Sequence, residues 1–398
     1  MKIILINNLY KPYARGGAER VVAAIADGLI QAGHEVVVVS TRPITSPPTP
    51  LLTKERGVIR FYPWNIISYY NLGKLSAALR LVWHLIDMFN IQSYFKIKKI
   101  LQHEKPDIVM THNLMGVGFL APRAIRACKI KHIHTLHDIQ LLHPSGLMMV
   151  GGENRVNSML AKAYQWCNKK LFASADVVIS PSEWLMKMHT DRGFFRKSKK
   201  AVVANPINTS PGPSLVRRGE REHKDKKFIF LYVGQIQKHK GVELLIEAFK
   251  DVETHCDASQ KIELQTIGGV ETRHGASLRD KNRNSNIKFL GKKSPEEVRE
   301  LMQSADCLVV PSLCYENQPT VIIEAKQNNL PVIASNIGGI PEMLSPEFLF
   351  KAGDRESLLN KMLCIIKNKN EAVSGENDRR HKIKGINVKE YIDKLLSL

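Results

Sequence analysis

A chain of 398 residues is long enough for two domains, each with a core of its own. Its apolar fraction of 43% is that of a globular protein, and its six cysteines stand singly, which argues against a disulfide framework or a zinc site. The net charge of +20 is concentrated in residues 1–210, where 28 Lys and Arg face 12 Asp and Glu, whereas the remainder carries 30 against 26. Nothing in this basic half resembles a nucleic-acid-binding module, so we expect an anionic membrane surface, and no nucleic acid, as its partner.

The N-terminus predicts the opening of a Rossmann-type domain. Residues 2–6 form an apolar strand, a loop leads to Gly16 and Gly17, a helix follows through Leu29, and EVVVVS at 35–40 is the second strand. The loop lacks a G-x-G-x-x-G fingerprint, so a dinucleotide site is weakly supported and the glycine pair could be a simple tight turn. The first apolar run is too short for a signal peptide, and no run is long enough to span a bilayer.

Two stretches of the N-terminal half leave their structure open. Residues 43–57 are rich in Pro, Thr and Ser and predict an irregular surface loop. Residues 75–102 are apolar with a basic flank that includes Arg80, Lys96 and Lys99. This pattern predicts one or two core helices, with an amphipathic surface that rests on a membrane as the minority interpretation.

Polar side chains follow two further predicted strands. The run at 108–110 ends in Thr-His-Asn, and the run from 130 ends in His137 and Asp138. In open α/β sheets ligands bind beyond the carboxyl ends of the strands, so both ends are candidate site positions, although a lone histidine there is more often an ordinary buried polar residue. Strands are also predicted at 175–182 and 201–204.

A Pro, Gly and charge-rich stretch at 208–226 predicts a linker between domains 1–207 and 227–398. The second domain begins with the strand FIFLYVG at 228, and a turn that carries Gln235, Lys240 and Gly241 leads into a helix from Val242 to Phe249. Cations at a glycine turn before a helix favour an anion. Further strands are predicted at 264–269 and 287–291, and an amphipathic helix at 388–396.

Residues 305–344 contain the most informative pattern. A buried strand at 307–310 precedes a polar turn, a helix from Thr320 to about Gln327, and a second strand at 331–334. Glu316 lies ahead of the helix and Glu324 lies inside it, eight positions later. A helix start can hold a diphosphate, and carboxylates accept hydrogen bonds from sugar hydroxyls, although two glutamates near a helix are also a common solvated pattern.

The segment ENQPTVIIEAKQNNLPVIAS, followed by Gly-Gly-Ile-Pro-Glu, resembles the E-x7-E signature of the retaining nucleotide-sugar glycosyltransferases of family 4. This resemblance implies an α/β protein of the GT-B fold, with two Rossmann-like domains whose parallel sheets face each other across a cleft. The N-terminal domain would be the acceptor side and the C-terminal domain would bind the donor. The last helix of such proteins often packs back on the first domain.

The resemblance also implies roles for particular residues. Glu316 would orient the donor sugar and Glu324 the ribose, while the helix start at Asn317, Gln318, Pro319 and Thr320, with Lys240 and the Gly16–Gly17 loop, would stabilise the diphosphate. The family pattern places an arginine where this chain has Gln235, which removes one fixed charge. His137 would lie at the reacting face, and Asp138, His143 and Ser145 would lie on the acceptor side.

The implied reaction is transfer from a UDP- or GDP-linked sugar to a glycan or a lipid-linked saccharide, in a cytoplasmic protein or one held peripherally at the inner face of the cell membrane. The family works without a metal, so neither a metal nor any other cofactor is expected. Two alternatives stay open. Gln235 favours a non-catalytic subunit that binds a nucleotide-sugar or acts as a scaffold, and an NAD-dependent dehydrogenase is disfavoured by the missing glycine fingerprint.

Overall fold

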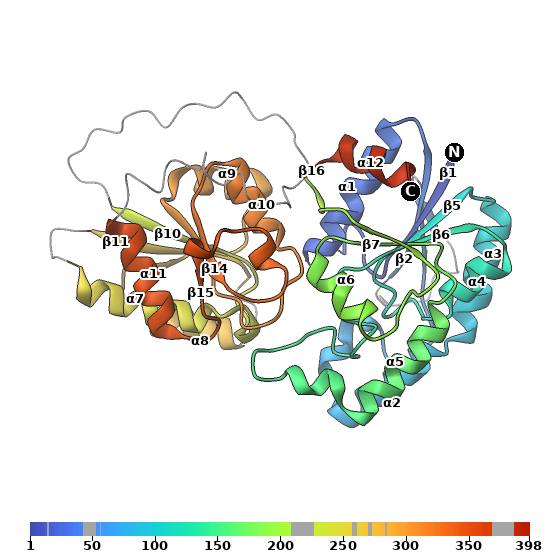
Figure 1. Cartoon of the computed structure of the whole chain (residues 1–398), viewed down its shortest axis with the longest axis horizontal. Helices are drawn as coiled ribbons and strands as arrows, with labels where there is room; N and C mark the ends of the chain where they lie inside the picture. The colour runs from blue at the N-terminus through green and yellow to red at the C-terminus, as the bar shows by residue number, and fades with distance from the viewer. Residues whose placement is uncertain are drawn as a thin grey trace. The chain divides into compact units, whose positions relative to one another are not determined.

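The computed structural model describes residues 1–13, 16–42, 53–55, 57–207, 227–256, 261–269, 273–282, 285–367 and 386–398. The chain divides into two compact units: residues 1–148, 153–208 and 385–398 form the first, and residues 149–152 and 209–384 form the second. Each unit is an α/β layer structure, so the fold class expected from the sequence is confirmed (Figure 1). The expected linker at 208–226 lies outside the described residues.

The first unit is built on a sheet whose described strands follow the order β3-β4-β2-β1-β5-β6-β7-β8. All are parallel except β3, which pairs antiparallel with β4. Its strands are β1 (Lys2–Ile6), β2 (Glu35–Thr41), β3 (Thr53–Glu55), β4 (Val58–Phe61), β5 (Ile108–Thr111), β6 (Lys131–Thr135), β7 (Val177–Ser180) and β8 (Lys199–Val202). Its helices are α1 (Gly17–Gln31), α2 (Ala77–Met88), α3 (Ile91–Glu104), α4 (Ala121–Ala127), α5 (Met159–Leu171) and α6 (Glu183–Thr190), with short 3-10 turns η1 (Tyr69–Lys74) and η2 (Glu153–Asn157).

The C-terminal residues complete the first unit. Strand β16 (Ile386–Asn387) pairs with β9 (Pro206–Ile207), and α12 (Val388–Leu396) packs on α1. The contact is close at Gly28 of α1, where an added Cβ would lie 2.1 Å from Val388 Cγ1. Tyr391, Ile392 and Leu395 are buried in the same core as the strands of this unit. The last helix of the chain therefore belongs to the first unit's core.

The second unit has a smaller, wholly parallel sheet of order β12-β11-β10-β13-β14-β15 in the described residues. Its strands are β10 (Phe228–Val233), β11 (Ile262–Ile267), β12 (Ile287–Phe289), β13 (Cys307–Val310), β14 (Val332–Ser335) and β15 (Leu349–Phe350). Its helices are α7 (Val242–His255), α8 (Arg273–Lys281), α9 (Pro295–Ser304), α10 (Thr320–Gln327) and α11 (Arg355–Lys367), with 3-10 turns η3 (Lys238–Lys240), η4 (Ile340–Glu342) and η5 (Pro346–Phe348). Both faces of the sheet are covered, which explains the continuous apolar runs that the sequence shows.

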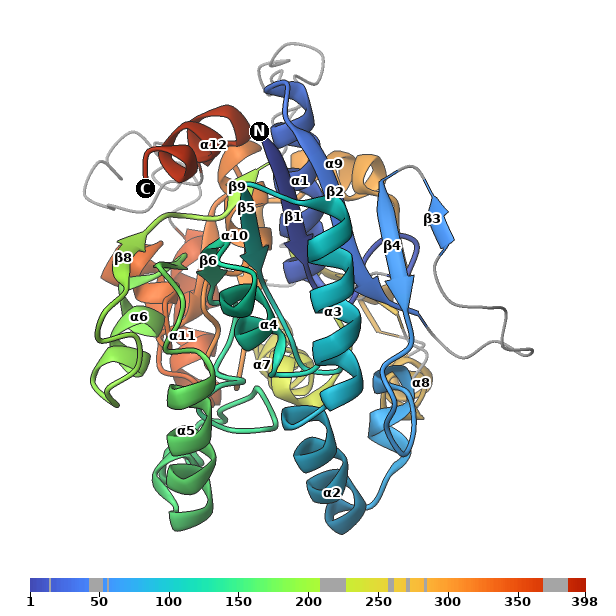
Figure 2. The same ribbon diagram turned by 90° about the vertical axis from the view of Figure 1, so that its right-hand side faces the viewer.

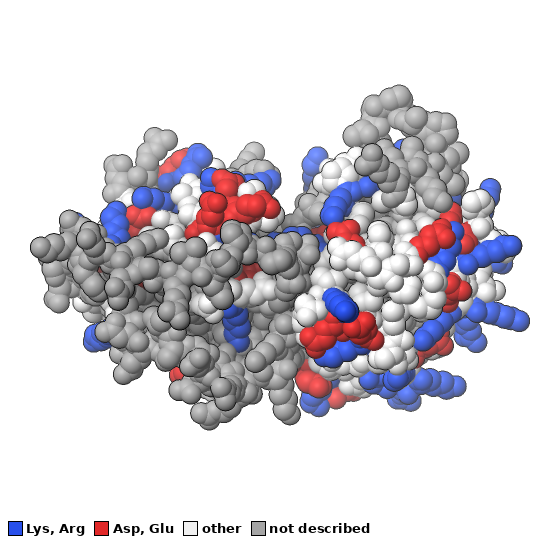
Figure 3. All heavy atoms as spheres, turned by 90° about the horizontal axis from the view of Figure 1, so that it is seen from above, with Lys and Arg blue, Asp and Glu red and all other residues white. Residues whose placement is uncertain are grey.

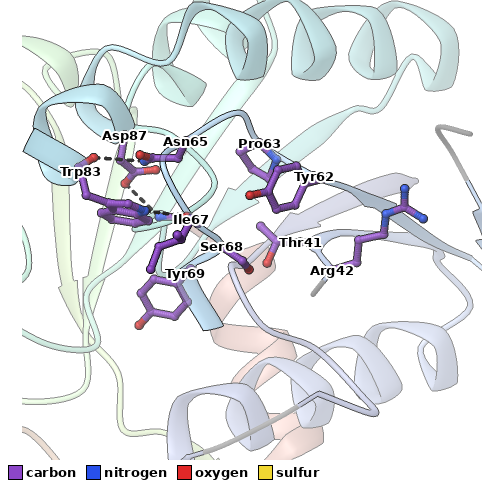
Figure 4. Close-up of a pocket in the computed structure, with 11 residues that line it drawn as sticks. Thr41, Arg42, Tyr62, Pro63, Asn65, Ile67, Ser68, Tyr69, Trp83 and Asp87 are labelled. Atoms are coloured by element: carbon purple, nitrogen blue, oxygen red, sulfur yellow. Dashed lines mark hydrogen bonds between the residues drawn. The ribbon is translucent and has the colours of Figure 1, made fainter. Parts of the chain in front are cut away.

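The apolar stretch at 75–102 forms two consecutive helices, α2 and α3, and only α3 packs broadly into the core. Helix α2 is held mainly along one edge, shown in Figure 4. There Trp83 Nε1 donates to the Ile67 carbonyl at 2.7 Å and Asn65 Nδ2 donates to the Trp83 carbonyl at 3.1 Å. Asp87 Oδ2 accepts from the Gly116 amide at 2.9 Å beside a cavity of about 10 Å³, and burial raises the pKa of Asp87 to about 7. Polar contacts thus fix the inner edge of α2.

The positive charge of the first unit is visible on its surface. Lys and Arg side chains stand along the outer edge of this unit in Figure 3. Among the described residues, no helix is long and apolar enough to cross a membrane.

Candidate functional site

In the second unit, two of the residues that the sequence singles out meet directly. Lys240, at the end of η3, places Nζ 2.5 Å from Glu316 Oε1, and Ser312 Oγ donates to the same oxygen at 3.0 Å. The two charged side chains are 27% and 18% exposed, so the pair is reachable from solvent without being loosely solvated. Burial alone would lower the pKa of Lys240, but the Glu316 carboxylate raises it above its ordinary value. Lys240 is therefore charged at neutral pH and available to an anionic ligand.

Two glycines let the backbone come close enough to form this pair. Gly241 has φ +71°, and an added Cβ would lie 1.8 Å from the Pro311 carbonyl oxygen. Gly338 has φ +62°, and its Cβ would lie 2.1 Å from the Glu316 carbonyl oxygen. Both positions combine a left-handed conformation with backbone contact, so only glycine fits. The turn that carries Lys240 is thus packed against the end of β13, and the Gly338 turn supports Glu316.

The start of α10 lies directly after Glu316. Pro319 is its N-cap, and Thr320 is its first residue, while Asn317 and Gln318 are buried at 9% and 6% exposure. Glu324 lies within the helix and is half-buried. The N-terminal amides of a helix carry a partial positive charge, and Lys240 adds a full one beside it. This end of the second unit therefore has the groups needed to hold a diphosphate and the carboxylates needed for hydroxyl groups.

Gln235, which replaces the arginine of the family pattern, has an exposed side chain. Its backbone carbonyl accepts a hydrogen bond from the Tyr232 hydroxyl at 2.7 Å, which fixes the turn. Position 235 is therefore held by its backbone, whatever the side chain. Sequence reasoning had missed Ser312 and Tyr232, which hold Glu316 and the Gln235 turn; both lie next to β-strand ends, where such residues could have been sought.

In the first unit, the glycine loop leads into α1 as the sequence predicts. Gly16 has an extended conformation with φ −144°, which other residues also adopt, and its amide donates to Glu19 Oε2 at 2.6 Å. Gly17 is the first residue of α1. Glu19 is only 8% exposed and stands at the positive end of its own helix. The backbone angles of Gly16 therefore do not require a glycine at this position.

The carboxyl ends of β5 and β6 bring His112 and His137 together. His112 Nδ1 lies 3.0 Å from His137 Nε2, with ring centroids 5.2 Å apart. His112 is completely buried, whereas His137 is partly exposed. Burial lowers the pKa of His137 to about 4, and burial together with His137 lowers the pKa of His112 well below its ordinary value. Both rings are neutral at pH 7, so one of them donates and the other accepts.

His112 was identified from the sequence only as a strand-end residue, and its partnership with His137 was missed. The signal was present, because His112 follows β5 as His137 follows β6, and neighbouring parallel strands place their ends side by side. Behind the pair, Thr111 Oγ1 lies 2.7 Å from His132 Nε2 and 2.8 Å from His134 Nδ1. A buried histidine cluster therefore underlies the end of the sheet.

The other acceptor-side candidates lie in two places. Asp138 Oδ1 accepts from the Gln140 amide at 2.7 Å, and Gln140 Nε2 donates to Asn113 Oδ1 at 2.6 Å, which links the β5 and β6 ends. Burial, with a smaller contribution from Glu19, raises the pKa of Asp138 to about 6. His143 Nδ1 lies 2.8 Å from Ser145 Oγ in the following loop. Burial, with smaller contributions from Arg80 and His143, lowers the pKa of His84 on α2 to about 4.

No group of three or more His, Cys, Asp and Glu side chains with the spacing of a metal site occurs in the part of the chain that the structure describes. The expected absence of a metal remains a prediction.

Comparison with known proteins gives matches over nearly the whole chain. The family described as Glycosyltransferase Family 4 matches residues 15–211, and the family described as Glycosyl transferases group 1 matches residues 216–384. An uncharacterized 42.6 kDa protein in the cps region of Klebsiella pneumoniae is 30% identical over 348 residues, which cover 86% of this chain and 87% of that protein. The UDP-Gal:alpha-D-GlcNAc-diphosphoundecaprenol alpha-1,3-galactosyltransferase of Escherichia coli is 22% identical over 87% of each chain.

Solved structures agree on the fold. The sucrose-phosphate synthase of Thermosynechococcus elongatus has a TM-score of 0.74 at 20% identity, over 100% of this chain and 98% of that one. HepE of Anabaena in complex with UDP has a TM-score of 0.68 at 18% identity, over 100% of both chains. The GT-B fold expected from the sequence is thereby confirmed.

Proposed function

Because the chain belongs to the glycosyl transferases of group 1, with an N-terminal half of glycosyltransferase family 4, we propose that it transfers a sugar from a nucleoside-diphosphate sugar to a hydroxyl of a glycan or a lipid-linked saccharide. The observation that carries the proposal is the Lys240–Glu316 pair beside the start of α10. We assign UDP as the first donor nucleotide to test, with GDP second, because the similar HepE structure holds UDP.

The chemistry follows from what each group can do. As the bond between sugar and diphosphate breaks, negative charge builds on the diphosphate, and Lys240 with the amides of α10 would stabilise it. Glu316 would orient the sugar hydroxyls, and Glu324 the ribose. His137 is neutral, so it offers the reacting sugar a hydrogen bond without a competing charge. Retention of the anomeric configuration and independence from metal are part of the proposal.

Two relatives indicate the context. One lies in the cps region of Klebsiella pneumoniae, and one is named for transfer to a diphosphoundecaprenol-linked sugar. We therefore propose a role in surface polysaccharide or glycolipid synthesis, with a lipid-linked acceptor reached at the inner face of the cell membrane. The basic first unit supports that location.

The first test is thermal stabilisation by UDP, GDP, ADP, CMP and NAD. A ligand at a hundred times its Kd stabilises the folded state by about 2.7 kcal/mol, which corresponds to a shift of several degrees. We expect a shift with one nucleoside diphosphate, lost in Lys240→Ala and in Glu324→Ala and kept in Lys250→Ala, whose lysine lies exposed on α7.

Two results would reject this assignment. The absence of a shift with every diphosphate would mean that Gln235 has disabled the donor site and would favour a scaffold subunit. A shift with NAD alone would favour the dehydrogenase alternative instead.

A second prediction separates the histidine pair from the donor site. His137→Ala is expected to lower the transfer rate by about a hundredfold or more, the usual contribution of a positioned acid or base. UDP affinity should stay unchanged, because Lys240 and Glu324, assigned to the diphosphate and the ribose, lie in the second unit. His112→Phe keeps a ring in place but removes the nitrogen that meets His137, so we expect a loss of about tenfold, the size of one lost hydrogen bond of ~1.4 kcal/mol.

The measurement is release of UDP from the donor sugar that binds, followed against pH. His112→Asn, which can restore a polar atom toward His137, should recover part of the rate lost in His112→Phe. His103→Ala, on an exposed histidine of α3, is the matched control and should behave as the parent. Equal rates for His137→Ala and this control would remove His137 from the mechanism.

A further inference from the structure

The first unit exposes a group of apolar side chains that do not pack into its own core. Ten of the eighteen large apolar side chains exposed in the described residues lie between positions 64 and 95, and none lies between 227 and 367. Among the described side chains of α2, only Trp83, Asp87 and Met88 are buried. Trp83 and Asp87 lie on the edge that Figure 4 shows. A helix whose outward side is apolar needs a partner, because large contiguous apolar patches are uncommon on monomeric proteins.

The exposed side chains line an open groove of about 820 Å³ between the end of α2 and the first turns of α3. Trp64, Phe89, Ile91 and Phe95 form it, with exposed fractions of 72%, 50%, 65% and 61%. We call this groove, together with Ile86, the α2–α3 surface. Figures 1 and 2 show α2 and α5 at the same lower end of the unit.

Charge around the α2–α3 surface has one sign. Lys96 and Lys99 border the groove itself. Residues 57–103 contain six Lys and Arg and a single acidic residue, Asp87, which is 2% exposed and serves the inner edge of α2. Within residues 57–103 the rim is thus cationic, and no described acidic side chain lines the groove.

Helix α5 repeats the combination at the same end of the unit. Met159 and Leu160 are 88% and 79% exposed, and Trp166 is 56% exposed. Lys170 places its Nζ 3.6 Å from the centre of the Trp166 ring. An exposed tryptophan beside lysine suits the boundary between lipid headgroups and acyl chains, where the ring meets both.

From these contacts we propose that the α2–α3 surface, supported by the start of α5, docks the protein on a bilayer that contains anionic lipid. Trp64, Phe89 and Phe95 would enter the headgroup region, and Lys96 and Lys99 would pair with lipid phosphates. The α2–α3 surface would thus be the part of the protein that contacts the membrane at the location proposed above, and the test of this contact does not depend on catalysis.

A second copy of the chain fits this surface less well. A twofold dimer would bring the same patch from both copies together and set Lys96 and Lys99 of each against those of the other. The patch has no described acidic partner for them, so the contact would be repulsive. Anionic lipid satisfies the apolar groove and the cationic rim together.

Co-sedimentation of the full chain with vesicles tests the proposal. One set of vesicles is pure phosphatidylcholine and the other contains about 30% phosphatidylglycerol, at physiological ionic strength. We expect binding to the anionic vesicles and a loss of at least about tenfold in the partition coefficient in Phe89→Ser/Phe95→Ser and in Lys96→Glu/Lys99→Glu. All four side chains are on the surface, and stabilisation by UDP, measured on the same variants, shows that the fold is kept.

Matched controls place the same changes elsewhere. Ile30→Ser changes an apolar residue of α1 that is 56% exposed. Lys131→Glu/Lys250→Glu reverses the charge of two exposed lysines that lie outside the α2–α3 surface. These should bind vesicles as the parent does, apart from the small uniform effect of net charge. Parent protein that stays in solution with anionic vesicles, or controls that lose as much binding as the α2–α3 variants, would overturn the proposal. So would dimerisation of the parent that the same variants abolish.

Discussion

Glu316→Gln is expected to lower kcat for sugar transfer by at least about a hundredfold, the usual cost of removing one preorganised charged group from a transition state. Glutamine keeps the size of the side chain but removes the negative charge of the carboxylate. In the parent, Oε1 of that carboxylate lies 2.5 Å from Lys240 Nζ and accepts from Ser312 at 3.0 Å. The amide oxygen can still accept from Lys240 and Ser312, but the amide nitrogen places two donors where the carboxylate has a second acceptor oxygen. The charge and one acceptor for the sugar hydroxyls are therefore lost together.

Nucleotide binding should respond differently from the rate. In the parent, the Lys240 ammonium interacts with the Glu316 carboxylate as well as with an incoming diphosphate. In the variant, residue 316 is neutral, so it no longer competes with the diphosphate for Lys240. We expect the Kd for UDP to stay within about threefold of the parent, or to tighten, a difference of ~0.7 kcal/mol at most. A fall in kcat at constant affinity identifies an interaction made in the transition state.

Glu300→Gln is the matched control, because this glutamate lies exposed on α9 of the same unit. It should leave both kcat and Kd unchanged. If Glu316→Gln transferred sugar at the parent rate, the assignment of the donor sugar to this pair would be wrong.

The first unit is expected to unfold in mild acid, at a higher pH than the second unit. Six of its histidines have a pKa lowered chiefly by burial: His84, His132, His137 and His189 to about 4, and His112 and His134 well below the ordinary value of 6.5. Below pH 6.5 the unfolded chain binds protons at these sites and the folded chain does not. The stability that they contribute is present above pH 6.5 and is lost as the pH falls toward 4.

Two carboxyls oppose this trend. Burial raises the pKa of Asp87 to about 7 and that of Asp138 to about 6, so each stabilises the folded state as it binds a proton on acidification. Each bound proton changes stability by roughly 1.4 kcal/mol per pH unit, and six histidines outnumber two carboxyls. The net loss between pH 7.5 and 5 is on the order of 5 kcal/mol, comparable with the whole stability of many domains.

Tryptophan fluorescence can follow this unit alone, because all four tryptophans, at 64, 83, 166 and 184, belong to it. Urea unfolding at several pH values gives the slope of stability against pH. His189→Gln should reduce that slope by about 1.4 kcal/mol per pH unit between pH 4.5 and 6. His103→Gln, whose histidine side chain is 80% exposed, should not. Identical urea midpoints at pH 5 and 7.5 would contradict the expectation.

The elements with local signals were predictable from the sequence. The strand at 307–310, the helix from Thr320 to Gln327 and the helix at 388–396 have the predicted bounds, since apolar period, proline and polar stops coincide there. Helix α7 runs on to His255, beyond the predicted Phe249, because nothing in KDVETH terminates a helix. Strand β3, inside the expected loop at 43–57, is defined by antiparallel pairing with β4, which has no local signature.

The site shows the same division. Glu316 and Lys240 were each recognisable, but their contact joins positions 76 residues apart and depends on backbone approaches at Gly241 and Gly338. The exposed face of α2 could not be predicted from the sequence for a different reason. An apolar helix that packs inward and one that presents its apolar face outward have the same sequence pattern, and only the anchoring of Trp83 and Asp87 decides between them.

The return of residues 385–398 to the first unit has a consequence for how the protein is made. Translation produces the sheet and most helices of that unit first, yet its core still lacks β16 and α12, which pack on β9 and α1. The second unit, residues 149–152 and 209–384, is synthesised in full before residues 385–398 emerge. During synthesis the face of α1 around Gly28 is therefore uncovered until residues 385–398 emerge, an interval in which chaperones or premature association can act on it.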